Sequence, residues 1–197
     1  MKIGKFSIWF VLIISVLLVV ACGGLRFSQL DTDATDYHPR KVAVFPVSVG
    51  SYEEARNPVE KIVPAELAAK KWFTSVIDTA SLNSQIQSNN ELRQLVTDYI
   101  SKLNTLNYSD PVMSEKISQL IDADAFLFVT VEEWRYTVEK EKNYANASIG
   151  VKLIDPATGK IMWRAAHNKR ERYMLVKSDM SRIARSVIID LINKMPH

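Results

Sequence analysis

The sequence has 197 residues, of which 25 are basic and 22 acidic, and its formal net charge is +3 at pH 7. A balance this close to neutral argues against nucleic acid as the main partner. The single cysteine excludes an intrachain disulfide, so an exported domain would rely on its hydrophobic core for stability. The length allows one domain with a substantial core.

The first 21 residues have the pattern of a secretory signal peptide. Lys2 and Lys5 make a basic start without any acid, and residues 6–20 are apolar apart from two serines. That apolar stretch of about 15 residues is shorter than the roughly 20 that cross a bilayer comfortably. The two lysines leave with the signal peptide, so the mature chain is closer still to neutral.

The four residues Val19-Val20-Ala21-Cys22 resemble the lipobox of bacterial lipoproteins. This resemblance implies that the Cys22 thiol receives diacylglycerol, that the chain is cut before it, and that the new amino group is acylated. Two or more acyl chains anchor a protein stably to a membrane, whereas one does so only marginally. The alternative is an uncleaved N-terminal membrane anchor that contains a cysteine by chance.

Residues 22–40 predict a flexible tether that starts at the lipidated cysteine. Residues 31–36 are mostly polar, and Pro39 is unfavourable within a helix. The tether would give the following domain, residues 41–197, some reach away from the bilayer.

The next part of the chain shows strand and helix patterns in turn. Lys41–Val47 is a β-branched run closed by a proline, and it predicts the first strand. A loop over 48–57 should lead to a helix that begins at Pro58, with Pro64 as a kink or a restart. Phe73–Asp78 predicts a second, short strand.

Residues 79–122 predict helices, with a loop over the Asn/Gln/Ser-rich stretch 83–90. Asp110 has the side chain of a helix N-cap, and Pro111 suits the first helical position. The remaining sequence predicts three strands, at 125–131 with a polar extension to Tyr136, at 145–154 and at 161–166. A turn over 155–160 should join the last two strands, and a final helix is predicted at 179–195. This order indicates a single α/β domain in which helices pack against one mixed sheet.

The sequence contains no pattern typical of a catalytic, metal or nucleotide site. It lacks the glycine-rich phosphate loops, the zinc-protease helix motif and the serine-hydrolase elbow. The histidines His38, His167 and His197 have no partner at metal-ligand spacing. We therefore expect no catalytic residue, no cofactor and no metal.

Glu132 and Glu133 are adjacent carboxylates, and they suggest a general acid/base pair. On a regular strand they would point to opposite faces, so they could not act together on one bond. The basic cluster Lys169–Arg172 fits a solvated loop, with lipid headgroups or an acidic partner as the alternative.

Trp134, Tyr136 and Tyr144 flank a charged connection and are the candidate interface residues. If their strands pair as a hairpin, the aromatic side chains would line an edge of the sheet, where interfaces favour them. The alternative is cross-strand packing on a half-exposed sheet.

Three segments resemble a family of Gram-negative outer-membrane lipoproteins of unknown function: Lys41–Val47, Asp122–Ala125 and Val151–Trp163. The domain also resembles the α/β module of the TolB N-terminal region. Similar modules occur in the curli secretion lipoprotein, a Pel polysaccharide export lipoprotein and a lipoprotein activator of penicillin-binding proteins. The resemblance implies a periplasmic module that binds proteins or forms homo-oligomers without catalysis.

The sequence thus favours a membrane-anchored, non-catalytic module of an envelope transport, export or assembly complex. An activator of a cell-wall synthase is the alternative, and a hydrolase using acids such as Glu132 or Asp155 is a third. Gly23 follows the lipidated residue in place of the aspartate that retains many enteric lipoproteins in the inner membrane. This favours the periplasmic face of the outer membrane.

Overall fold

The computed structural model describes residues 25–197. Three long antiparallel strands dominate it: β4 (Ala125–Glu139), β5 (Lys142–Ile154) and β6 (Ile161–Tyr173). β4 and β5 are joined by only Lys140 and Glu141, both at positive φ. Two such residues match the right-handed twist of the flanking strands, which suits a tight hairpin. All three strands extend beyond their predicted ranges, because their polar ends still pair in the ladder.

The complete sheet has six strands in the order β1-β6-β5-β4-β2-β3. The short strands β2 (Lys41–Val44) and β3 (Ser75–Ile77) run parallel to each other, and β2 runs parallel to β4. The predicted mixed sheet in an α/β domain is confirmed. β4 lies inside the sheet between β2 and β5, as its largely apolar sequence indicated.

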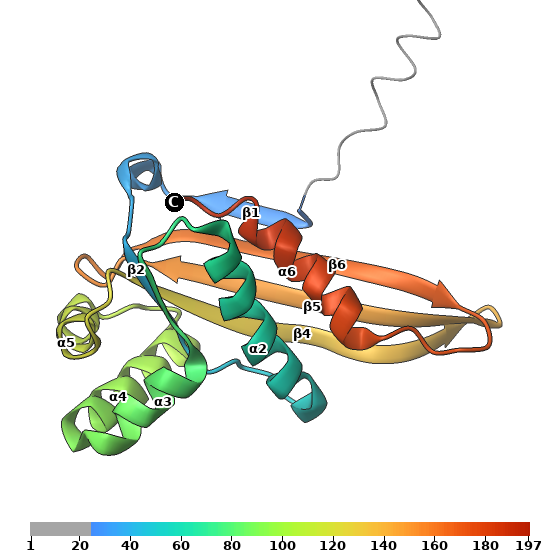
Figure 1. Ribbon diagram of the computed structural model, residues 1–197, viewed down its shortest axis with the longest axis horizontal. Coiled ribbons are helices and arrows are strands. Elements are labelled where there is room, and N and C mark those ends of the chain that lie inside the picture. The colour runs from blue at the N-terminus through green and yellow to red at the C-terminus, as the bar shows by residue number, and fades with distance from the viewer. Residues whose placement is uncertain (1–24) are drawn as a thin grey trace, which may run out of the picture.

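Helices cover the two faces of the sheet unequally (Figure 1). α2 (Glu53–Lys70) and α6 (Met180–Ile192) lie on one face, where they share a core with the strands. α3 (Thr79–Ser88), α4 (Asn90–Leu106) and α5 (Pro111–Ile121) cover only the end of the other face around β2. Alternation along β2 separates the two cores, since Val42 and Val44 face the first and Ala43 the second.

Local signals explain most of the helix boundaries. Asp110 accepts hydrogen bonds from the amides of Val112 and Met113, with Pro111 in the first turn, as predicted. The predicted loop over 83–90 is wrong, because α3 continues to Ser88 and the Asn89 side chain caps α4.

The predicted start of α2 at Pro58 is also wrong. The helix begins at Glu53 and contains both prolines. Arg56 stabilises its first turn by bonding the Glu53 carboxylate and donating 2.7 Å to the Val47 carbonyl. The missing N–H of each proline removes only one hydrogen bond from a helix that packs along its length.

The prediction of a tether through residue 40 is wrong for the part that the structure describes. Strand β1 (Phe27–Leu30) pairs antiparallel with β6, and a 3₁₀ helix, η1 (Thr32–Asp36), follows it. The Trp163 indole N–H donates 3.0 Å to the Ser28 hydroxyl, which fastens β1 to the edge of the sheet. Hydrogen-bonding partners far along the chain therefore outweigh the polar local sequence.

Candidate functional site

The strongest residue prediction, lipidation of Cys22, lies outside the described residues, as does the signal peptide. Among residues 25–197, no helix is both long and apolar enough to cross a bilayer. The same part of the chain holds no group of three potential metal ligands.

The three predicted interface residues do not form one surface. Trp134 is only 6% exposed and belongs to the core beneath α2 and α6. Tyr136 lies on the same face two residues further along β4, and it is 40% exposed. Tyr144 pairs with Thr137, so it lies on the opposite face, where the Arg170 guanidinium sits 3.5 Å from its ring centre. A hairpin brings the three together in sequence, but strand alternation separates them.

Glu132 and Glu133 share a face, contrary to the prediction. A β-bulge in β4 shifts the register between Val131 and Glu133, so Glu132 is the additional residue and Glu133 pairs with Ser148. Glu132 accepts a hydrogen bond from the Ser148 hydroxyl at 2.8 Å and also pairs with Arg26. Each carboxylate has a basic partner, since Glu133 pairs with Arg135.

The predicted loop at Lys169–Arg172 is part of strand β6, so the solvated-loop interpretation is wrong. Because side chains alternate along a strand, the charged side chains of this segment point to both faces of the sheet, and most of them form ion pairs. Lys169 pairs with Asp190 of α6 at 2.6 Å, and Arg170 pairs with Glu139 at 2.7 Å. The segment therefore joins β6 to its neighbours and does not present a single basic patch.

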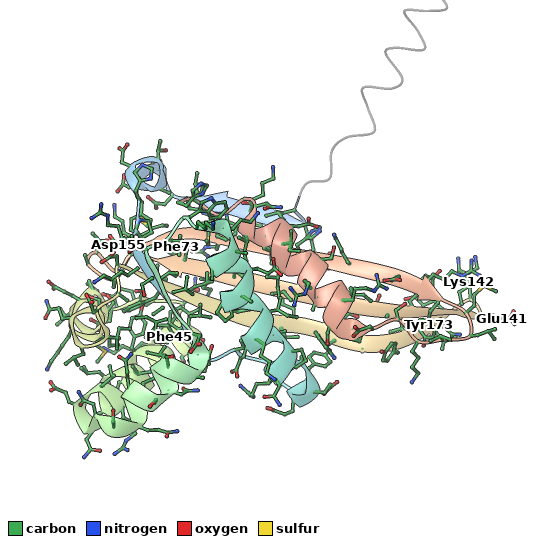
Figure 2. The ribbon with its side chains drawn as sticks, in the orientation of Figure 1. Phe45, Phe73, Glu141, Lys142, Asp155 and Tyr173 are labelled. Atoms are coloured by element: carbon green, nitrogen blue, oxygen red, sulfur yellow. The ribbon has the colours of Figure 1, made fainter. Side chains whose placement is uncertain are left out.

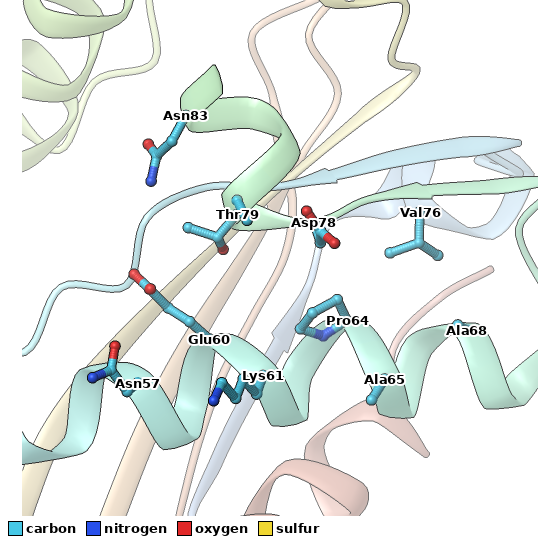
Figure 3. Close-up of a pocket in the computed structure, with 11 residues that line it drawn as sticks. Asn57, Glu60, Lys61, Pro64, Ala65, Ala68, Val76, Asp78, Thr79 and Asn83 are labelled. Carbon is cyan, nitrogen blue, oxygen red and sulfur yellow. The ribbon is translucent and has the colours of Figure 1, made fainter. Parts of the chain in front are cut away.

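A groove lies between α2 and the start of α3, beside the outer edge of β3 (Figure 3). Its volume is about 630 Å³. Pro64 and Ala68 form part of the α2 wall, and Val76 and Asp78 lie opposite them. No pattern in the sequence predicted this groove, because it depends on how α2 and α3 are placed in space.

The polar groups of the groove are held in place by their own contacts. Asp78 caps α3 by accepting a hydrogen bond from the Ser81 amide at 2.7 Å, and this bond lowers the pKa of its carboxyl. Glu60 accepts from the Val47 amide at 3.3 Å.

The backbone of β3 adds an open hydrogen-bonding position. Ser75 donates to the Arg40 carbonyl and so faces β2. Alternate residues direct their backbone groups to opposite sides, so the N–H and C=O of Val76 face the groove. Such an edge can accept an extended segment of another chain.

A second surface lies at the far end of the long strands, and we call it the distal tip (Tyr136, Val138 and Met174–Val176). Met174, Leu175 and Val176 are 77%, 98% and 82% exposed, and they link β6 to α6. The Tyr136 hydroxyl donates 2.8 Å to the Ser178 carbonyl, which holds this linker against β4. Figure 2 shows this end of the sheet, with Lys142 and Tyr173 labelled, beyond the helices.

No protein-family model matches the sequence, and a search of curated proteins found no match. Solved structures, however, share the architecture. The PelC dodecamer from Paraburkholderia phytofirmans is 17% identical, with a TM-score of 0.56 over 87% of this chain and 99% of that chain. Lipoprotein GNA1162 from Neisseria meningitidis is 19% identical, with a TM-score of 0.52 over 79% and 99%.

This chain has a fold that bacterial lipoproteins use. Identities below 20% show the shared fold alone, and the roles of those proteins do not transfer with it. The LpoB C-terminal domain from Escherichia coli is 13% identical over 68% of this chain and 84% of that chain, with a TM-score of 0.36. That similarity is too weak to support the synthase-activator alternative. The likeness to the TolB and curli modules stays a prediction.

Proposed function

We propose that this protein is a lipid-anchored, non-catalytic module that assembles with copies of itself in the bacterial envelope. The anchor is Cys22, and the site is the periplasmic face of the outer membrane. The observation that carries this proposal is the fold, which matches nearly the whole of a chain that forms a dodecamer. The lipobox and the following Gly23 support the anchor and its location.

The open edges of the sheet support a ring-like assembly. β1 lies at one edge and β3 at the other, and these edges present different surfaces. Contact between two different surfaces of identical chains is head-to-tail, and such contacts close into rings when the rotation allows. The exposed side chains Phe27 and Leu30 of β1 are apolar, and the groove beside β3 offers Pro64 and Ala68. We assign these two edges to the contact between neighbouring copies.

Two measurements test the proposal separately. Mass spectrometry of the protein extracted from membranes should find Cys22 at the N-terminus with diacylglycerol and an added acyl chain. Native mass spectrometry of the full chain in detergent should find an oligomer. An unprocessed N-terminus would contradict the anchor, and a monomer at every concentration would contradict the assembly.

A matched pair of variants tests the assigned edge. Ala68→Arg places a long cation in the groove, whereas Ala69→Arg places one on an exposed position of the same helix that does not line the groove. Arginine is a good helix former, so both variants should fold. We expect only Ala68→Arg to shift the mass distribution towards the monomer. Equal behaviour of the two variants would place the contact elsewhere.

A further inference from the structure

We propose that the distal tip is a second membrane contact, which enters the headgroup layer of the bilayer that holds the lipidated cysteine. The inference goes beyond assembly, but it rests on the proposed lipidation of Cys22. Its first support is the grouping of apolar side chains. Single exposed apolar residues are ordinary on protein surfaces, but a contiguous group marks a contact with a protein or a membrane.

The tip exists because the sheet is longer than the helices that cover it. Trp134, Tyr136 and Val138 alternate onto the face that α6 covers. α6 begins at Met180, so Trp134 is buried while Tyr136 and Val138 are exposed. Tyr173 packs against Tyr136 with ring centroids 5.6 Å apart. The apolar face therefore continues past the end of its helix layer.

The charges around the tip fit an anionic lipid surface. Within the described chain, four cations at this end form no ion pair: Lys140, Lys142, Arg172 and Lys177. Of the acids nearby, Glu139 is paired with Arg170 and Glu171 with Arg182, so Glu141 of the hairpin opposes these four cations and leaves an excess of positive charge. Basic residues beside an apolar group are attracted to anionic headgroups while the apolar side chains enter the interface.

The covalent chain can bring the tip and the anchor to one bilayer. Three peptide links separate Cys22 from Leu25, which allows a span of at most about 10 Å. β1 enters the sheet at Phe27, opposite Ala166 of β6. The Met174–Val176 part of the tip begins eight residues beyond Ala166, which is about 26 Å at strand spacing. Since β1 runs away from the tip, its entry point is the end of β1 that lies nearer to the tip.

A bilayer suits the tip better than a second copy of the chain. The tip offers five apolar side chains at a narrow end, whereas stable protein interfaces use about 20–30 residues a side. A lipid interface needs no such area, because acyl chains supply the main anchorage and the tip only fixes the orientation.

The test uses Leu175→Cys in the full, lipidated chain. Cys22 is the only natural cysteine and its thiol is blocked by lipid, so an environment-sensitive dye reacts at position 175 alone. The labelled protein is placed in vesicles of phosphatidylethanolamine and phosphatidylglycerol with nitroxide-labelled lipid as a quencher. Val112→Cys is the control, because Val112 is 75% exposed on α5 at the opposite end of the sheet.

We expect at least twofold stronger quenching at position 175 than at position 112. The difference should shrink when phosphatidylcholine replaces phosphatidylglycerol or when Met174 and Val176 are changed to aspartate. Equal, weak quenching at both positions overturns the proposal. A blue-shifted dye at position 175 that the lipid quencher does not reach also overturns it, since another protein copy then covers the tip.

Failure of the anchor itself gives a different result. A protein without lipid on Cys22 takes two dye molecules and does not float with the vesicles. That outcome overturns the proposed function together with this inference, whereas a floating protein with an unquenched tip overturns the inference alone.

Discussion

Tyr136 of β4 and Tyr173 of β6 meet edge to face although strand β5 lies between their strands. The contact marks where the helix layer ends and the exposed part of the sheet begins. On one side of it Trp134 is buried beneath the helices, and on the other side Val138 is exposed. Trp134 therefore contributes to stability, whereas Tyr136 and Val138, which follow it at intervals of two residues, are in contact with the surroundings.

This difference predicts opposite outcomes for two aromatic substitutions. Trp134→Ala removes a large buried side chain and should lower the free energy of unfolding by about 3–5 kcal/mol. Tyr136→Ala removes a half-exposed ring and should cost much less. Urea unfolding followed by circular dichroism measures both. Equal losses would mean that α6 and the sheet do not separate the two positions as described.

Gly159 should tolerate no side chain. Its φ is +69°, and a β-carbon there would lie 2.9 Å from the Ser109 carbonyl oxygen. Gly50 also has a positive φ, of +54°, but nothing lies within 4 Å of the corresponding position. Alanine at Gly50 should cost only the left-handed backbone, about 1–2 kcal/mol. Alanine at Gly159 should cost clearly more in the same unfolding measurement, and equal costs would contradict the close contact.

The stability of the protein should fall as pH rises from about 10 to about 12. Burial raises the pKa of Tyr99 to about 12, and its hydroxyl lies 2.7 Å from that of Ser109. Between these pH values the unfolded chain can release the Tyr99 proton while the folded protein keeps it, so the free energy of unfolding decreases. Burial raises the pKa of Tyr37 as well.

Tyr99→Phe is the matching variant for this pH effect. It should lower the free energy of unfolding by about 1 kcal/mol near neutral pH, because one hydrogen bond is lost. It should also make the fall in the free energy of unfolding above pH 10 shallower, and the part of the fall that remains should come from Tyr37. An unchanged slope would show that Tyr99 ionises equally in both states.

Hydrogen exchange can test the attachment of β1. The Asp31 amide donates 2.9 Å to the Met162 carbonyl, and Phe27–Leu30 pair with β6. We expect slow exchange over this stretch, against fast exchange in the linker Met174–Val176. Ser28→Ala removes the bond from Trp163 and should speed exchange in β1. Fast exchange in the unaltered protein would restore a free tether through residue 40.

The sequence predicted the elements whose signals are local. The Asp110 cap, the strand over 145–154 and the turn after Asp155 all appear where the pattern placed them, although the polar side chains of Asn146 and Ser148 are buried as well. Hydrophobic periodicity also gave the correct fold class, since each amphipathic element needs a partner layer.

The failures share one physical cause, which is that distant partners decide the outcome. β1 has little strand pattern of its own, and it is a strand because β6 has an open edge. The bulge at Glu132 changes which face a carboxylate occupies, and no periodic rule places it. The tip and the groove depend on where helices end in space, so they could not be read from the chain.

The way β1 enters the sheet has a mechanical consequence. A pull from the bilayer first reaches the domain at Leu25, which packs against the core, and at Arg26, which pairs with Glu132. It then acts along β1, whose four residues pair with β6 in register. Force along the strand loads all the hydrogen bonds between β1 and β6 at once, whereas force across the strand breaks these bonds one at a time. The edge strand β1 therefore transmits force from movements of the envelope to the whole sheet.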